Sequence, residues 1–126
     1  MRSPLRILVL ELDQSRATAI RDALTEGGWS DVTLLSDMKG LARRLHEIDP
    51  DIVLIDLENP SRDLLEQVSA ASDATGRPVA MFVDNSDDNM TSAAVAAGLS
   101  AYVVGDLVPE RIKPVLKTAI ARFQMV

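Results

Sequence analysis

Short apolar runs alternate with segments of helical periodicity along the whole chain. The runs are almost continuous and do not alternate with polar residues, which is typical of strands that are covered on both faces. Each intervening segment has apolar positions three and four residues apart, which is the spacing of one helix face. The pattern predicts five strands, at residues 7–10, 32–35, 52–55, 79–83 and 101–104.

Cap and turn residues mark the ends of the predicted helices. Gly27 follows the first helical segment and predicts its end. Asp37 and Ser61 have side chains that suit the N-caps of the second and third helices. The strongest apolar stripe predicts a fifth helix over residues 112–123.

Five strand–helix pairs predict an α/β domain built on a parallel sheet. Because crossovers between parallel strands are right-handed, the strands wind outward from the first one, in the order 2-1-3-4-5. This order predicts a flavodoxin-like (βα)5 doubly wound fold with its crevice at the carboxyl ends of strands one and three. With 126 residues, the chain forms one domain.

Four carboxylates follow the first and third predicted strands. Glu11 and Asp13 come at the end of the first strand, and Asp56 and Glu58 come at the end of the third. The two strands are neighbours in the expected order, so these acids converge in the crevice. Like charges repel at that distance, and oxygen ligands suit Mg²⁺, so the cluster weakly predicts a magnesium site. The alternative is that the acids are solvated loop residues.

Composition excludes several classes of site. The chain has no cysteine, which excludes disulfides, thiolate zinc sites and cysteine nucleophiles, and its single histidine, His46, excludes a multi-histidine metal cluster. The net charge of −6 argues against direct binding of a nucleic-acid backbone. The apolar runs are far shorter than the roughly 20 residues that span a bilayer. These features predict a cytoplasmic protein that has no membrane segment.

Three stretches of the chain resemble a known family. Residues 51–60 (DIVLIDLENP), 77–87 (RPVAMFVDNSD) and 94–114 (AVAAGLSAYVVGDLVPERIKP) are similar to response regulator receiver domains of the AmiR/NasT type. The resemblance implies that Asp56 is the phosphoacceptor aspartate and that Glu11 is the first acid of the family's acidic pair. It also implies that Glu58 offers a backbone carbonyl to the metal ion.

The chain departs from the receiver pattern at three positions. Leu12 stands where the family has its second acid, Val83 where it has a threonine or serine, and Gly105 where it has a lysine. These changes remove a metal ligand, a hydroxyl donor and a positive charge that hold the phosphoryl group in the family. We therefore expect a degenerate receiver, or pseudo-receiver, that acts through protein contacts and is not an enzyme.

The resemblance implies a role in two-component phosphorelay signal transduction, as the input domain of a regulator of transcription antitermination. The first alternative is a functional phosphoacceptor that is phosphorylated on Asp56 with Mg²⁺ held by Glu11 and Asp13. An alternative of another class is a small flavodoxin-like cofactor-binding protein, for which the loop after the first strand offers only Ser15 and Arg16 to a phosphate. A purely structural oligomerisation module is a further alternative.

The resemblance also implies partners. A sensor histidine kinase or another sensor protein would act on the domain. Residues 1–126 are expected to form the receiver-like domain alone, and RNA would be bound only by a C-terminal ANTAR domain that is absent from this chain. A homodimer is expected through three segments, which run from Met90 to Ala97, from Ala101 to Val104 and from Ile112 to Phe123.

Overall fold

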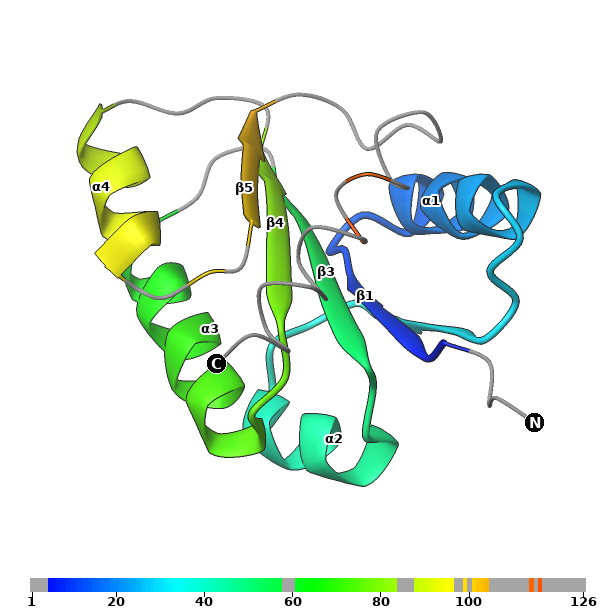
Figure 1. Cartoon of the computed structure of the whole chain (residues 1–126), viewed down its shortest axis with the longest axis horizontal. Helices are drawn as coiled ribbons and strands as arrows, with labels where there is room; N and C mark the ends of the chain where they lie inside the picture. Colours follow the sequence, from blue (N-terminus) through cyan, green and yellow to red (C-terminus); the bar gives the residue numbers. More distant parts are fainter. Residues whose placement is uncertain are drawn as a thin grey trace.

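The computed structural model describes residues 5–57, 61–83, 88–96, 99, 101–104, 114 and 116. Strands and helices alternate along the chain, as the sequence predicts (Figure 1). In chain order the elements are β1 (Ile7–Leu10), α1 (Gln14–Glu26), β2 (Val32–Leu35), α2 (Leu41–Ile48), β3 (Ile52–Leu57), α3 (Arg62–Thr75), β4 (Val79–Val83), α4 (Asp88–Ala96) and β5 (Ala101–Val104).

The five strands form one parallel sheet in the order β2-β1-β3-β4-β5, which confirms the predicted topology. β3 extends two residues beyond the predicted strand, so Asp56 lies within the strand and pairs in register with Phe82. The predicted fifth helix lies outside the described residues except for Pro114 and Leu116, which are both helical.

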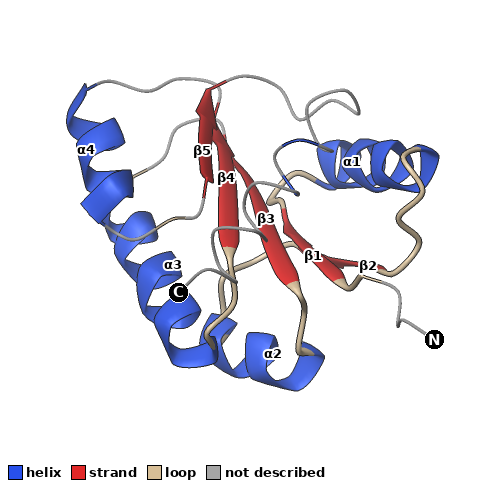
Figure 2. Ribbon diagram, viewed as in Figure 1, coloured by secondary structure: helices blue, strands red, loops and turns tan. Residues whose placement is uncertain are grey.

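Helices cover the sheet on both faces. α1 lies on one side, and α2, α3 and α4 lie on the other (Figure 2). Side chains of a strand alternate between these faces, so Ile7 and Val9 pack with Leu24 of α1, while Leu8 and Leu10 pack with Leu65 of α3. Burial on both sides explains why the strands have almost no polar position. The exceptions include Thr33 in the half-buried strand β2 at the edge of the sheet and, fully buried, Asp56 in β3.

The predicted helix ends agree with the structure at two positions and disagree at one. α1 ends at Glu26 with Gly27 as its C-cap, and the Ser61 hydroxyl accepts a hydrogen bond from the Leu64 amide at 3.2 Å. The prediction for Asp37 is wrong, because α2 begins later, after Gly40 in the left-handed region. The Asp37 carboxylate instead accepts a hydrogen bond from the Lys39 amide and forms an ion pair with Arg44. A local turn thus takes the side chain that the sequence assigned to a cap.

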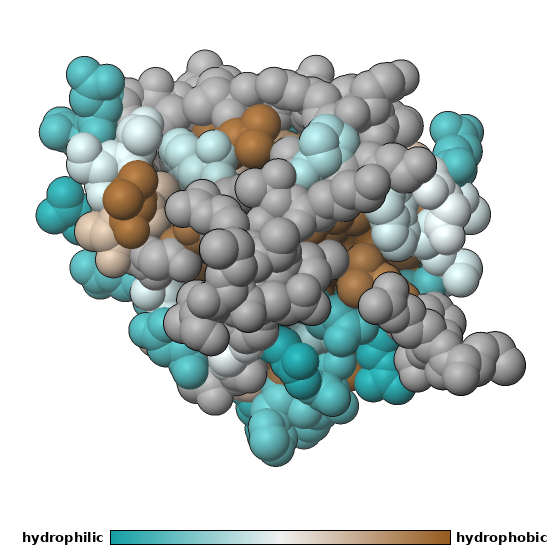
Figure 3. All heavy atoms as spheres, in the orientation of Figure 1, coloured by the Kyte–Doolittle hydropathy of each residue, from teal (hydrophilic) through white to brown (hydrophobic). Residues whose placement is uncertain are grey.

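The surface is polar over much of the described chain. Hydrophilic side chains cover α2 at the lower edge of the space-filling view, whereas an apolar group stands out over α4 (Figure 3). Two large hydrophobic side chains are exposed among the described residues, Val95 of α4 at 73% and Leu12 at 54%. A search of the described residues finds no helix with the length and apolar character needed to cross a bilayer.

The two-sided burial of the sheet gives a test of the core. Leu54 of β3 is 1% exposed, so Leu54→Ala is expected to lower the free energy of unfolding by about 2–5 kcal/mol, because it leaves a cavity between the sheet and α1. The matched control is Leu12→Ala on the surface, with an expected change within about 0.5 kcal/mol. Urea denaturation followed by circular dichroism measures both, and equal losses would contradict the assigned burial.

Candidate functional site: an acidic notch at the carboxyl edge of the sheet

Two carboxylates from neighbouring strands meet at the carboxyl edge of the sheet. Leu10 of β1 pairs in register with Ile55 of β3, so the next residue on each strand, Glu11 and Asp56, comes to the same place. Glu11 is 4% exposed and Asp56 is 2% exposed, and they are the buried charged residues of the described chain. We call this pair, with Arg16 described below, the acidic notch.

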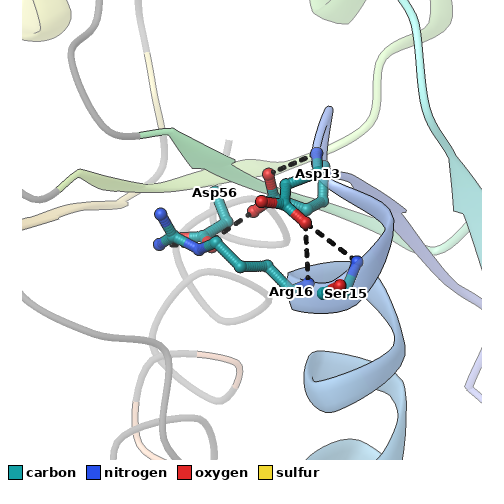
Figure 4. A network of polar contacts seen from close by, with 5 residues as sticks. Asp13, Ser15, Arg16 and Asp56 are labelled. Carbon is teal, nitrogen blue, oxygen red and sulfur yellow. Dashed lines mark hydrogen bonds and ion pairs between the residues drawn. The ribbon is translucent and has the colours of Figure 1, made fainter.

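Arg16 fills the notch with a positive charge. It comes from the first turn of α1, and its Nη2 lies 2.8 Å from Oδ2 of Asp56. Its Nε lies 3.7 Å from Oε2 of Glu11, so one guanidinium pairs with both carboxylates. Figure 4 shows the Arg16 side chain extending from the helix start toward Asp56. A third of the Arg16 side chain remains exposed, which places the guanidinium at the mouth of the notch.

The local backbone holds this arrangement through Asp13. The Asp13 carboxylate is the N-cap of α1 and accepts hydrogen bonds from the amides of Ser15 at 2.8 Å and Arg16 at 3.3 Å (Figure 4). The Asp13 amide in turn donates to Oε1 of Glu11 at 3.0 Å. The cap therefore fixes where α1 begins, and with it the direction in which the Arg16 side chain leaves the helix.

Burial makes the ion pair a structural requirement. An ionised carboxylate taken out of water loses several kcal/mol of solvation unless a counter-charge and hydrogen bonds replace the water. Arg16 supplies that charge to Asp56 in direct contact and to Glu11 at a longer distance. Oε2 of Glu11 has no hydrogen-bond partner in the described structure. One guanidinium therefore serves two buried carboxylates.

The notch with Arg16 in it does not fit a divalent metal ion. Asp13 uses its carboxylate as a helix cap and is exposed, and Glu58 lies outside the described residues. The Arg16 guanidinium pairs with Oδ2 of Asp56, so a metal ion at Asp56 would lie beside a positive charge. The described part of the chain contains no group of three or more acidic, histidine or cysteine side chains that would hold a metal.

The rim of the notch is apolar where the family pattern has polar groups. Val83 ends β4 in register with Leu57 and is fully buried, so it offers no hydroxyl to the notch. Leu12 is exposed beside Glu11 and carries no metal ligand. Gly105 lies outside the described residues. His46 is exposed on α2, away from the notch elements.

Sequence reasoning missed the role of Arg16. The sequence does contain a signal for it, because Arg16 follows Glu11 by five residues and falls in the first turn of the helix that starts at the carboxyl end of β1. A basic side chain at the first turn after an acidic strand end is within reach of that edge of the sheet. From the sequence, Arg16 is predicted only as a possible ligand for a phosphate.

Comparison with known proteins supports one fold. No protein-family model matches the chain. The chain is similar to the transcriptional regulatory protein PdtaR of Mycobacterium tuberculosis, in two strains, with 24% identity over 121 residues and 96% of this chain covered. The chain spans only 59% of the length of that relative.

Several solved structures share the fold of this chain although their sequence identity to it is low. The signal receiver domain of a modulated diguanylate cyclase from Desulfovibrio desulfuricans superposes with a TM-score of 0.82, at 16% identity and with 98% of each chain covered. A CheY-like receiver domain protein from Methanospirillum hungatei gives 0.81 at 17% identity, again with 98% of each chain covered. The fold is that of a response regulator receiver domain.

The receiver fold extends to proteins with other descriptions. A putative pilus assembly-related protein from Burkholderia pseudomallei has a TM-score of 0.82 at 22% identity, with 94% of this chain and 90% of that chain covered. At these identities the likeness is one of fold. What this receiver fold does therefore has to be argued from the residues of its notch.

The ion pair in the notch gives a test by substitution. Arg16→Met removes the guanidinium but keeps much of the apolar stem, and it is expected to lower the free energy of unfolding by about 3 kcal/mol, since two buried carboxylates lose their counter-charge. Arg21→Met on the exposed side of α1 is the control, with an expected change within about 0.5 kcal/mol. Chemical denaturation measures both.

A double variant separates charge from packing. Arg16→Met with Asp56→Asn is expected to be more stable than Arg16→Met alone, because it leaves one buried carboxylate in place of two. Equal stability of the single and double variants would contradict the ion pair as the reason for the loss.

Proposed function

We propose that this chain is the input domain of a transcriptional regulator and that it works as a pseudo-receiver, through protein contacts and without phosphorylation. The observation that carries the proposal is the contact between Arg16 and the carboxylate at the phosphoacceptor position, with 2.8 Å between Nη2 and Oδ2 of Asp56. The receiver fold provides the setting for the proposal.

The contact acts against the chemistry of phosphoryl transfer. A carboxylate oxygen that attacks phosphorus needs an available lone pair and a cation that neutralises the incoming phosphoryl oxygens. Arg16 pairs with Oδ2 of Asp56, so one of the two oxygens that could attack phosphorus is already engaged by a positive charge of the protein itself. Val83 offers no hydroxyl to hold the transferred group, and Leu12 offers no second acid for a metal ion.

The regulatory output is proposed from similarity. The relative with a transcriptional role is longer than this chain, and the quoted stretches of sequence resemble AmiR/NasT receivers. We assign transcription antitermination to the whole protein, with RNA bound by a helical domain outside residues 1–126. The net charge of −6 supports a domain that leaves nucleic-acid contact to another part of the protein. A sensor protein or a sensor kinase would supply the input by docking.

A dimer is proposed through α4 and β5. Val95 of α4 is 73% exposed, and large apolar side chains at that exposure favour a contact surface when they lie on an element that other copies can reach. The predicted third segment of this surface, residues 112–123, lies outside the described residues except at two positions.

Phosphorylation is tested directly. The chain is incubated with acetyl phosphate and Mg²⁺, and its intact mass is expected to stay unchanged, because Arg16 holds Asp56. The control is a receiver domain of known phosphoacceptor activity treated in the same reaction, which shows that the phosphoryl donor is active. A stoichiometric gain of one phosphoryl group in the wild type, abolished by Asp56→Asn, would show a working phosphoacceptor and reject the proposal.

The dimer surface is tested by charge. Val95→Asp is expected to shift the chain from dimer to monomer in analytical ultracentrifugation, since a carboxylate would be placed in an apolar contact. Ala19→Asp, at an exposed position of α1 on the opposite face of the sheet, is the matched control and is expected to leave the distribution unchanged. A monomeric wild type, or equal effects of the two variants, would count against this surface.

A further inference from the structure

We infer that Arg16 is the resident cation of the acidic notch and takes the place of a divalent metal ion, so that the domain keeps its notch balanced without Mg²⁺. The inference deepens the proposed function, because it says what controls the same site. It concerns metal binding, which is measured without any phosphoryl donor, so an experiment can reject this inference or the proposed function separately.

The first support is where the guanidinium lies. A cation between Glu11 and Asp56 would contact one oxygen from each of the two adjacent strands, and Arg16 reaches one oxygen of each, at 3.7 Å and 2.8 Å. It reaches them from α1, a third element, and Figure 4 shows the side chain directed into the notch. The arrangement links the two strand ends and the helix start through one charged group.

The second support is what this position denies to a metal ion. Mg²⁺ binds carboxylate oxygen at about 2.0–2.1 Å and loses its water reluctantly. To bind Oδ2 of Asp56 it would have to displace Arg16, and at another oxygen of the notch it would lie beside a fixed positive charge. An arginine side chain does not lose its proton at any physiological pH, so the competing charge is permanent.

The third support is an oxygen that Arg16 leaves unsatisfied. Oε2 of Glu11 is buried and has no hydrogen-bond partner, while Oε1 is held by the Asp13 amide. Glu11 is thereby fixed, with one oxygen available on the Arg16 side. Without Arg16, this oxygen and the Asp56 carboxylate would lose the positive charge that pairs with both of them, and two buried anionic ligands without that charge favour uptake of a divalent cation.

The position of Arg16 depends on the helix start. The backbone amide of Arg16 donates a hydrogen bond to the Asp13 carboxylate, which orders the backbone from which the Arg16 side chain extends. The residue therefore loses less conformational entropy when its side chain forms the ion pair. The planar guanidinium presents several N–H groups and reaches two carboxylates at once, which a compact ammonium does less well. These features identify a built-in counter-ion.

Mn²⁺ binding tests the inference on the whole 126-residue chain. Free Mn²⁺ is followed by its electron paramagnetic resonance signal in titrations of wild type, Arg16→Met and the control Arg21→Met. The wild type and Arg21→Met are expected to show no stoichiometric site below millimolar Mn²⁺. Arg16→Met is expected to bind one Mn²⁺ at least tenfold more tightly, and 10 mM Mg²⁺ is expected to raise its Tm by about 3–6 °C.

Two further variants complete the test. Arg16→Gln removes the charge but keeps a polar side chain, and gained binding there supports the inference if Arg16→Met folds poorly. Arg16→Met with Asp56→Asn is expected to lose the gained site, which places it in the notch. Stoichiometric Mn²⁺ binding by the wild type as tight as that of Arg16→Met, or no gain in either Arg16 variant, overturns the inference. Phosphorylation of the wild type without Mn²⁺ binding would reject the proposed function alone.

Discussion

A buried carboxylate needs a positive charge, and much of the notch follows from how this chain meets that need. Asp56 lies inside a parallel sheet whose other described strand positions are almost all apolar, with only 2% of its surface exposed. Water cannot solvate it there, so the counter-charge has to come from a bound ion or from the protein. The contact with Arg16 shows that the protein supplies it.

The fold decides which residues compete for that role. Parallel strands bring their carboxyl ends to one edge, and α1 begins at that edge, a few residues after β1. Glu11 and Arg16 therefore share one short connection, with Asp13 between them as the cap. The carboxylate that could bind a metal ion and the arginine that takes the place of that ion are therefore only a few residues apart in the sequence. The same fold can hold either a bound metal ion or an arginine side chain at this position.

The sequence predicted the sheet and the location of the notch well, because both depend on strong, repeated signals. Runs buried on both faces identify strands, and acids that directly follow two neighbouring strands must meet. Asp37 was misassigned because a local Asx-type turn and a helix cap use the same side chain, and only the position of Gly40 decides between them. Arg16 was missed because pairing depends on side-chain reach across elements, which periodicity does not report. Glu58 and Gly105 lie outside the described residues, so their predicted roles stay predictions.

A counter-ion that belongs to a helix differs from a diffusible ion in one mechanical respect. Because the guanidinium is covalently part of α1, any protein that tilts or lifts the first turn of that helix pulls the charge away from β3. The sheet would then register a displacement at the surface as an electrostatic change in its interior. In such a domain, the binding of a partner to α1 can change the electrostatics of the buried site directly, because the Arg16 side chain connects the two.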